Sequence, residues 1–405
     1  MKKILILKIS ILLGVCSYSQ RNTDLLYLKN QLIKKGYLFH SFKKEAFIKL
    51  IKSYSDKDKT GVNIAVIDNI LSNFKEIDLQ PINNQENKFF KIKCIDNEPH
   101  IVKINKEFNF LLEQEILKIN GIPIKKLKEK LTKTFYLPHP SLISKFMEER
   151  LFQKDYLTYL DLTKEDSILI TTKKYTGKIP LSGDIISTIK VEKELFKNRK
   201  NNLWFWSYGI NFGQQVYLKF NKILSASHMQ KMKDSLKWQN YTYAKNYNIP
   251  IQQTYNPLKF TDLTNKLHLK FSNSRYKKLI IDFRDTNIGT DYNLNHFIYH
   301  LKKIKRLKGK RRIYILIDKN TNGASLAYIQ QLKLHFKPIV IGETCYGTIQ
   351  TQNDFETIEL PESKLKIKIP KKRHIETEII PDIKTIQTLK QTVKGIDASL
   401  NQCLE

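Results

Sequence analysis

The chain has 405 residues and a formal net charge of +31, which results from 70 basic and 39 acidic side chains. This length leaves room for two or three domains with a sizeable core. The lysines are spread along the whole chain in a background rich in isoleucine and asparagine, which favours a solvated basic surface and argues against a nucleic-acid interface.

The first residues have the layout of a signal peptide, which we assign to residues 1–19. Two lysines at positions 2 and 3 precede an apolar run over residues 4–15, and Ser17-Tyr18-Ser19 supplies small residues before a cut at Gln20. The run is too short for a membrane-spanning helix, and no later segment reaches the roughly 18 apolar residues that such a helix needs. We therefore expect an exported chain, periplasmic or extracellular, with no transmembrane helix.

Four cysteines are present, and the first of them leaves an alternative open. Cys16 allows a lipoprotein cut, although Val15 stands before it where a small residue is preferred. The other three are Cys94, Cys345 and Cys403, an odd number that allows one disulfide and one free thiol. Because no Cys-x-x-Cys pair occurs, a structural zinc site is not expected.

Apolar residues at helical spacing predict a helical region over residues 20–80. Leucines recur at this spacing over residues 25–32, and similar patterns cover residues 47–51 and 62–74. Such a period is typical of helices that bury one face.

The segment 85–135 has the pattern of a small β unit. Short strands are predicted over residues 89–94, 100–104 and 109–111. A strand, an Asn-Gly turn and a second strand follow within residues 115–124, and a helix then continues to Phe135. Asn-Gly between apolar strands is a strong hairpin signal. We expect a PDZ-like unit here, followed by a connector of helices and strands over residues 136–200.

The C-terminal half, residues 201–400, alternates strands with helices. Strands are predicted over residues 216–220, 278–283, 312–317 and 338–342, and helices over residues 229–238, 293–304 and 324–335. Strands separated by helices of this length argue for a largely parallel sheet covered by helices. The predicted fold class is therefore α/β.

Several short motifs resemble those of the tail-specific (carboxy-terminal processing) serine peptidases. Residues 278–284 are similar to the family's strand that ends in Asp-x-Arg, and residues 312–329 to the strand and elbow that present its nucleophile. Residues 338–344 resemble the next strand with its Gly-Glu signature, and residues 115–124 the PDZ-like strand with Ile-Asn-Gly. The resemblance covers roughly residues 70–385 and implies a crotonase-like layered core.

The resemblance implies a catalytic serine at the start of a helix. The family has a Thr-Ala-Ser-Ala type of segment there, and residues 323–329 align with it, which places Ser325 at the nucleophile position. Ser325 lies 18 residues before Glu343, slightly fewer than in the family, so the alignment needs a shortened helix or loop. A serine at a helix start is also a common N-cap, and this alternative stays open.

The other catalytic positions of the family are substituted. Lys75 stands where one branch has a histidine, and Thr348 stands where the other branch has a lysine. In the oxyanion turn, Asp285 and Ile288 are departures from the family pattern, and Gly289 alone remains of a glycine pair. A lysine base needs burial to lower its pKa, so Lys75 is either that base or an exposed lysine at a helix end. An anionic Asp285 would oppose an oxyanion nearby.

Two functions follow from these residues. The first is an exported serine-type peptidase with Ser325 as nucleophile and an atypical base. The second is a pseudopeptidase that binds peptide or unfolded protein segments without cleaving them. No cofactor or metal is expected, because His296 and His300 stand four residues apart without a third ligand at a telling distance. The basic run 302–312 allows an anionic envelope polymer as a further partner, although a solvated face is the simpler interpretation.

Overall fold

The computed structural model describes most of the chain in two compact units. The described residues are 23–40, 42–57, 63–74, 80–82, 89–183, 187–188, 205–210, 215–221, 265, 267–271, 276–286, 294–308, 312–349, 355–371 and 376–404. Unit 1 contains residues 1–93, 98–188 and 354–375, and unit 2 contains residues 94–97, 189–353 and 376–405. None of the described helices has the length and apolar character that a bilayer crossing requires. The predicted signal peptide and the predicted helix at 229–238 lie outside the described residues.

The N-terminal helices of unit 1 share a hydrophobic cluster with a much later β hairpin. A helix over residues 23–33 is followed by η1 (Gly36–His40), α2 (Lys44–Lys57) and α3 (Ile64–Ser72). The hairpin strands are β15 (Phe355–Glu359) and β16 (Lys366–Pro370), and β1 (Gln80–Ile82) pairs with β16. Phe47, Ile67 and Ile367 are fully buried in this cluster. The predicted helices are confirmed, whereas the hairpin that completes their core comes from the C-terminal part of the sequence.

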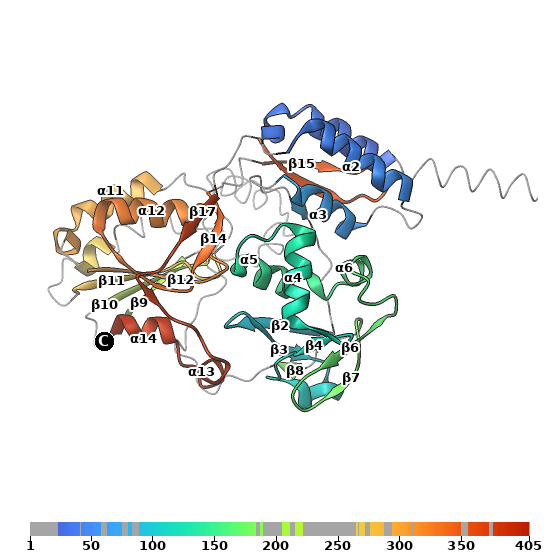
Figure 1. Cartoon of the computed structure of the whole chain (residues 1–405). Coiled ribbons are helices and arrows are strands. Elements are labelled where there is room, and N and C mark those ends of the chain that lie inside the picture. Colours follow the sequence, from blue (N-terminus) through green and yellow to red (C-terminus); the bar gives the residue numbers. More distant parts are fainter. Residues whose placement is uncertain are drawn as a thin grey trace, which may run out of the picture. The chain divides into compact units, whose positions relative to one another are not determined.

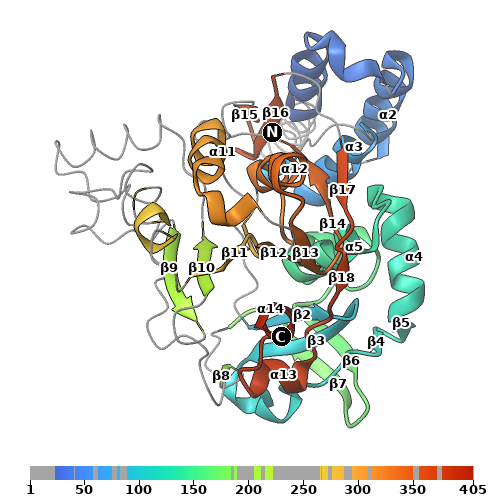
Figure 2. The same cartoon turned by 90° about the vertical axis from the view of Figure 1, so that its left-hand side faces the viewer.

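The rest of unit 1 contains two small sheets (Figures 1 and 2). The first contains β2 (Phe90–Ile95), whose last two residues are counted with unit 2, together with β3 (Glu98–Ile104) and β8 (Ser187–Thr188). The second contains β5 (Ile122–Pro123), β4 (Lys118–Ile119), β6 (Ser167–Thr171) and β7 (Thr176–Pro180). Asn120 and Gly121 have φ angles of 47° and 78°, as a tight hairpin turn between β4 and β5 requires. The predicted strand at 109–111 is wrong, because these residues belong to the short helix η2 (Lys106–Leu111), which the Asn105 side chain caps.

Helices α4 to α6 complete unit 1. They are α4 (Ile124–Phe135), α5 (Pro140–Phe146), η3 (Met147–Leu151) and α6 (Lys154–Tyr159). A buried ion pair ties them to α3, because Arg150 donates to the Asp68 carboxylate at 2.5 Å and the Tyr156 hydroxyl donates to the same oxygen at 3.1 Å. Although burial opposes the charge, the Asp68 carboxylate raises the pKa of Arg150 above its ordinary value.

Unit 2 is built on a six-stranded sheet with the order β18-β13-β12-β11-β10-β9. The strands are β9 (Phe205–Ile210), β10 (Gln215–Phe220), β11 (Lys278–Asp282), β12 (Ile313–Ile317), β13 (Ile339–Gly342) and β18 (Ile383–Lys384). All neighbouring pairs are parallel except β9 with β10. Every residue of β12 is buried, as expected for a central strand covered on both faces. The predicted α/β fold with a largely parallel sheet is confirmed.

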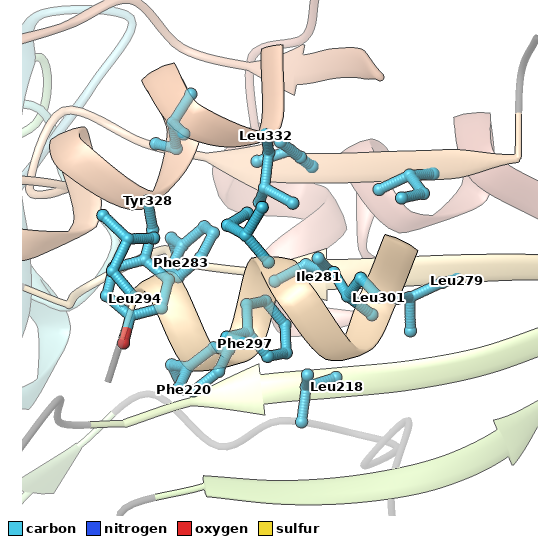
Figure 3. Close-up of a cluster of buried hydrophobic side chains, with 14 of the residues drawn as sticks. Leu218, Phe220, Leu279, Ile281, Phe283, Leu294, Phe297, Leu301, Tyr328 and Leu332 are labelled. Carbon is cyan, nitrogen blue, oxygen red and sulfur yellow. The ribbon is translucent and has the colours of Figure 1, made fainter. Parts of the chain in front are cut away.

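Helices cover both faces of this sheet (Figure 1). On one face lie α11 (Leu294–Lys303) and α12 (Ala324–Phe336), and on the other lies α14 (Ala398–Leu404). Figure 3 shows the cluster under α11 and α12, where Phe220, Phe283, Phe297 and Tyr328 gather from two strand ends and two helices. The remaining elements of unit 2 are η4 (Lys305–Lys308), β14 (Cys345–Thr348), β17 (Glu376–Ile379) and α13 (Leu389–Val393).

A buried charge network fixes the carboxyl end of β11. The Asp282 carboxylate accepts hydrogen bonds from Arg284 at 2.6 Å, Lys219 at 3.3 Å and the Tyr217 hydroxyl at 2.5 Å. Arg284 also donates two hydrogen bonds, of 2.8 and 2.7 Å, to Asp397, which precedes α14. Although burial alone would raise it, the charges of Arg284 and Lys219 hold the pKa of Asp282 well below its usual range.

We expect Arg284→Ala to lower the free energy of unfolding by about 3–5 kcal/mol, because it removes one partner of a buried ion pair and leaves the Asp282 charge enclosed. Lys333→Ala, an exposed change on α12, serves as the control and should alter the free energy by less than about 0.5 kcal/mol. Urea unfolding at neutral pH, followed by circular dichroism, measures both. Equal effects of the two changes would contradict the role given to Arg284.

Candidate active site

The segment predicted to carry the nucleophile lies at the carboxyl edge of the sheet in unit 2. It connects β12, which ends at Ile317, to α12, which begins at Ala324. The residue before the helix, Gly323, has φ 65° and ψ −130°, a conformation that residues other than glycine rarely adopt. In many serine hydrolases a strained turn from strand to helix presents the nucleophile. In this chain the residue with the positive φ angle is a glycine, which adopts this conformation without strain and has no side chain to present.

Ser325 lies in the first turn of α12 and faces the interior of unit 2. Only 1% of its surface is exposed, and its hydroxyl donates a hydrogen bond to the Thr286 carbonyl at 3.0 Å. The N-cap of α12 is Gly323, which has no side chain to cap the helix, so the alternative that Ser325 is the N-cap is wrong. The Ser325 hydroxyl instead ties the start of α12 to the turn that follows β11.

The Thr286 carbonyl is the shared acceptor of this turn. It accepts the Ser325 hydroxyl and also the backbone N–H of Asn322, the latter at 3.1 Å. The Thr286 hydroxyl in turn donates to the Phe220 carbonyl at the end of β10, at 2.5 Å. A backbone carbonyl can hold a hydroxyl in place but cannot take its proton, so this contact does not activate Ser325.

Two carboxylates occupy the place where the resemblance implies an oxyanion turn. The Asp285 backbone N–H donates to the Asp318 carboxylate at 3.0 Å, and the Asn320 side-chain amide donates to the Asp285 carboxylate at 2.9 Å. Asp318 also accepts the Thr321 hydroxyl at 3.0 Å. Burial, followed by the neighbouring Asp285 charge, raises the pKa of Asp318 to about 7. Negative charge at this place would oppose an oxyanion.

The structure describes only some of the substituted family positions. Thr348 is the last residue of β14 and is 6% exposed, and its hydroxyl is not a base at neutral pH. Lys75, Ile288 and Gly289 lie outside the described residues. The roles expected for Lys75 as a base and for Gly289 in an oxyanion turn therefore stay predictions.

The described residues form neither a reactive thiol site nor a metal site. Cys94, Cys345 and Cys403 are buried and are not joined in disulfides, and burial raises the pKa of Cys345 and of Cys403 to about 12, which keeps both protonated. Among the described residues, no group of three histidine, cysteine or acidic side chains could hold a metal ion. The His300 ring packs against His268, with ring centroids 5.7 Å apart, and the His296 side chain lies outside the described set.

Asp318 and Lys319 shape this turn, although no sequence motif marked them as site residues. Asp318 directly follows the fully buried strand β12, and the carboxyl ends of parallel strands commonly carry functional polar residues, so its position was a usable signal. The Lys319 amine is buried and donates to the Cys94 carbonyl at 2.5 Å. No sequence pattern indicates the contact between Lys319 and Cys94, because these residues are far apart in the chain.

Comparison with solved structures places this geometry in a known fold. No protein-family model matches the sequence, and no curated protein matches it. The crystal structure of mature CPAF matches 93% of this chain and 95% of its own, at 10% identity and a TM-score of 0.53. Mature CPAF complexed with lactacystin matches 93% of this chain and 96% of its own, at 11% identity and the same TM-score of 0.53.

A photosystem II D1 C-terminal processing protease also matches 93% of this chain and 98% of its own, at 9% identity and a TM-score of 0.35. At identities this low, the likeness establishes the fold alone. The chain therefore shares its fold with CPAF, and the α/β fold class predicted from the sequence is confirmed.

The raised pKa of Asp318 predicts that its contribution to stability falls as the pH rises. In the unfolded chain the carboxyl has its ordinary pKa of 3.8, so this contribution is fully present below that value and is lost as the pH rises through about 7. Asp318→Asn removes this titrating group. Between pH 4 and 7 the free energy of unfolding should therefore fall less in the variant than in the wild type, and the two decreases should differ by on the order of 2–4 kcal/mol. Urea unfolding at a series of pH values measures this difference, and identical pH profiles for the two proteins would contradict it.

Proposed function

We propose that this chain is an exported protein that binds peptide or unfolded protein segments and does not cleave them through Ser325. The observation that carries the proposal is the Ser325 hydroxyl, which is buried and donates to the Thr286 carbonyl. A serine nucleophile needs a base that accepts its proton and an open approach for the substrate carbonyl. The observed contact provides neither, and the residue with a positive φ angle before the helix is Gly323, which has no side chain.

Peptide binding is supported by the shared fold and by an open strand edge in unit 1. One of the matching CPAF structures is a complex with lactacystin, so in that protein the fold accommodates a ligand. Among the described strands, β7 pairs only with β6, which leaves its outer edge available to an added strand. Main-chain hydrogen bonds to such an edge are a common way to bind extended peptides. The PDZ-like unit predicted over 85–135 belongs to the same part of the chain.

Export is part of the proposal because the sequence pattern of residues 1–19 supports it. A short basic region, an apolar run and small residues before Gln20 are the features on which secretion depends. After export, the expected ligand is an extended or unfolded segment of another envelope or secreted protein.

A serine-type peptidase is the second candidate. The observation that favours it is the place of Ser325 in the first turn of α12, directly after the central strand β12, in a fold shared with CPAF. For this function the Ser325 hydroxyl would have to leave the Thr286 carbonyl and meet a base, for which Lys75 is the residue that the family resemblance implies.

A fluorophosphonate probe, which labels activated serines, separates the two candidates. We expect no labelling of residues 20–405, and binding of fluorescently labelled β-casein without cleavage, measured by anisotropy and by gel. Ser325→Ala should change the casein affinity by less than about twofold, because the hydroxyl that it removes is buried.

Ser399→Ala is the matched control, since Ser399 is also buried in unit 2 and its hydroxyl is 2.6 Å from that of Thr385. Labelling of the wild type that survives in Ser399→Ala and disappears in Ser325→Ala would overturn the proposal and establish the peptidase. Failure of the wild type to bind casein, or any other unfolded protein, would remove the binding function.

A further inference from the structure

The helices over one face of the unit 2 sheet come from segments of sequence that contain no acidic residue. Residues 265–271, 294–308 and 324–337 include nine lysines and arginines and neither aspartate nor glutamate. We call the exposed side of these segments the acid-free surface. Its exposed lysines are Lys302, Lys303, Lys305, Lys333 and Lys337. Helices α11 and α12 pack side by side in this surface, as Figures 1 and 2 show.

Contacts between side chains join the three segments. Lys302 Nζ lies 3.4 Å from His335 Nε2, which connects the C-terminal turns of α11 and α12. The rings of His300 on α11 and His268 in the segment 267–271 lie 5.7 Å apart. Lys303 Nζ lies 4.1 Å from the centre of the Tyr299 ring. These contacts place the three segments beside one another.

Large apolar side chains stand exposed on the same segments. Leu269 is 73% exposed, Leu334 is 70% exposed and Tyr299 is 54% exposed. A single exposed apolar residue is ordinary on a protein surface, but here three exposed apolar side chains occur together with exposed lysines. Interfacial membrane binding uses this combination, because apolar side chains enter the boundary of the headgroups while cations pair with lipid phosphates.

We infer that the acid-free surface docks unit 2 on an anionic phospholipid membrane. The lysines supply the charge complementary to the phosphates, and the two leucines and Tyr299 supply the apolar contact. A soluble anionic polymer would pair with the lysines but would leave Leu269 and Leu334 in water. The exposed leucines therefore favour a lipid surface over a polymer.

This inference stands apart from the proposed peptide binding. Ser325 lies ten residues before His335 along α12, a rise of roughly 15 Å, so changes at the acid-free surface leave the Ser325 turn in place. Helix α4 of unit 1 offers a matched comparison, because it exposes Lys125 and Lys126 while its apolar residues are buried.

Co-sedimentation of the mature chain with vesicles tests the inference. We expect binding to vesicles of phosphatidylglycerol and phosphatidylcholine, and no binding to vesicles of phosphatidylcholine alone. The double reversal Lys302→Glu and Lys303→Glu should weaken binding at least about tenfold, since each lysine at an anionic surface contributes several-fold to affinity. Leu269→Ser with Leu334→Ser should weaken it at least about fivefold, because both lose apolar contact with the bilayer.

The control is the double reversal Lys125→Glu and Lys126→Glu, which makes the same charge change on α4 and should leave binding within about twofold of the wild type. Circular dichroism checks that each variant is folded. Equal weakening by the two double reversals would show that net charge alone acts, and would overturn the inference. The absence of binding to anionic vesicles would also overturn it. The same holds if the chain binds dextran sulfate as strongly as it binds vesicles and the leucine changes do not weaken that binding.

Discussion

The buried ion network at the carboxyl end of β11 is the constraint on which the rest of unit 2 depends. The Asp282 carboxylate accepts hydrogen bonds from Lys219 of β10 and from Arg284, which lies just after β11. Arg284 also donates to Asp397, the residue before α14. The Lys219 amine also donates to the Arg284 carbonyl, which fixes the chain as it leaves the strand. The next two residues then turn toward β12 and α12, so that the Thr286 carbonyl meets the Ser325 hydroxyl. The geometry of the candidate site therefore follows from charges buried beside it.

Much of this fold could be predicted from local patterns. The strands at 278–282, 313–317 and 339–342 each contain an unbroken run of at least three apolar residues, and helical periods separate them, a pattern that indicates a parallel sheet. The hairpin of residues 355–370 could not be placed, because its association with the N-terminal helices depends on a contact between opposite ends of the chain. The error at 109–111 arose because a short apolar segment does not distinguish a strand from a helical turn, and the Asn105 cap decided the outcome.

The candidate site was predictable in position but not in orientation. The order of the motifs predicted that Ser325 lies at the start of a helix that follows a central strand. The structure has this helix, α12, after β12. In a helix each residue turns the side chain by about 100°, so a motif that places a residue in the first turn does not specify which way its side chain points. Ser325 faces inward, and the residue with a positive φ angle before the helix is Gly323.

A crystal structure of residues 20–405 at a resolution that places side-chain oxygens tests the central claim most directly. The account predicts that the Ser325 hydroxyl lies at hydrogen-bond distance from the Thr286 carbonyl and that Gly323 keeps a positive φ. A Ser325 hydroxyl that instead lies within about 3.2 Å of a lysine or histidine nitrogen, open to solvent, would contradict the account and identify a working nucleophile.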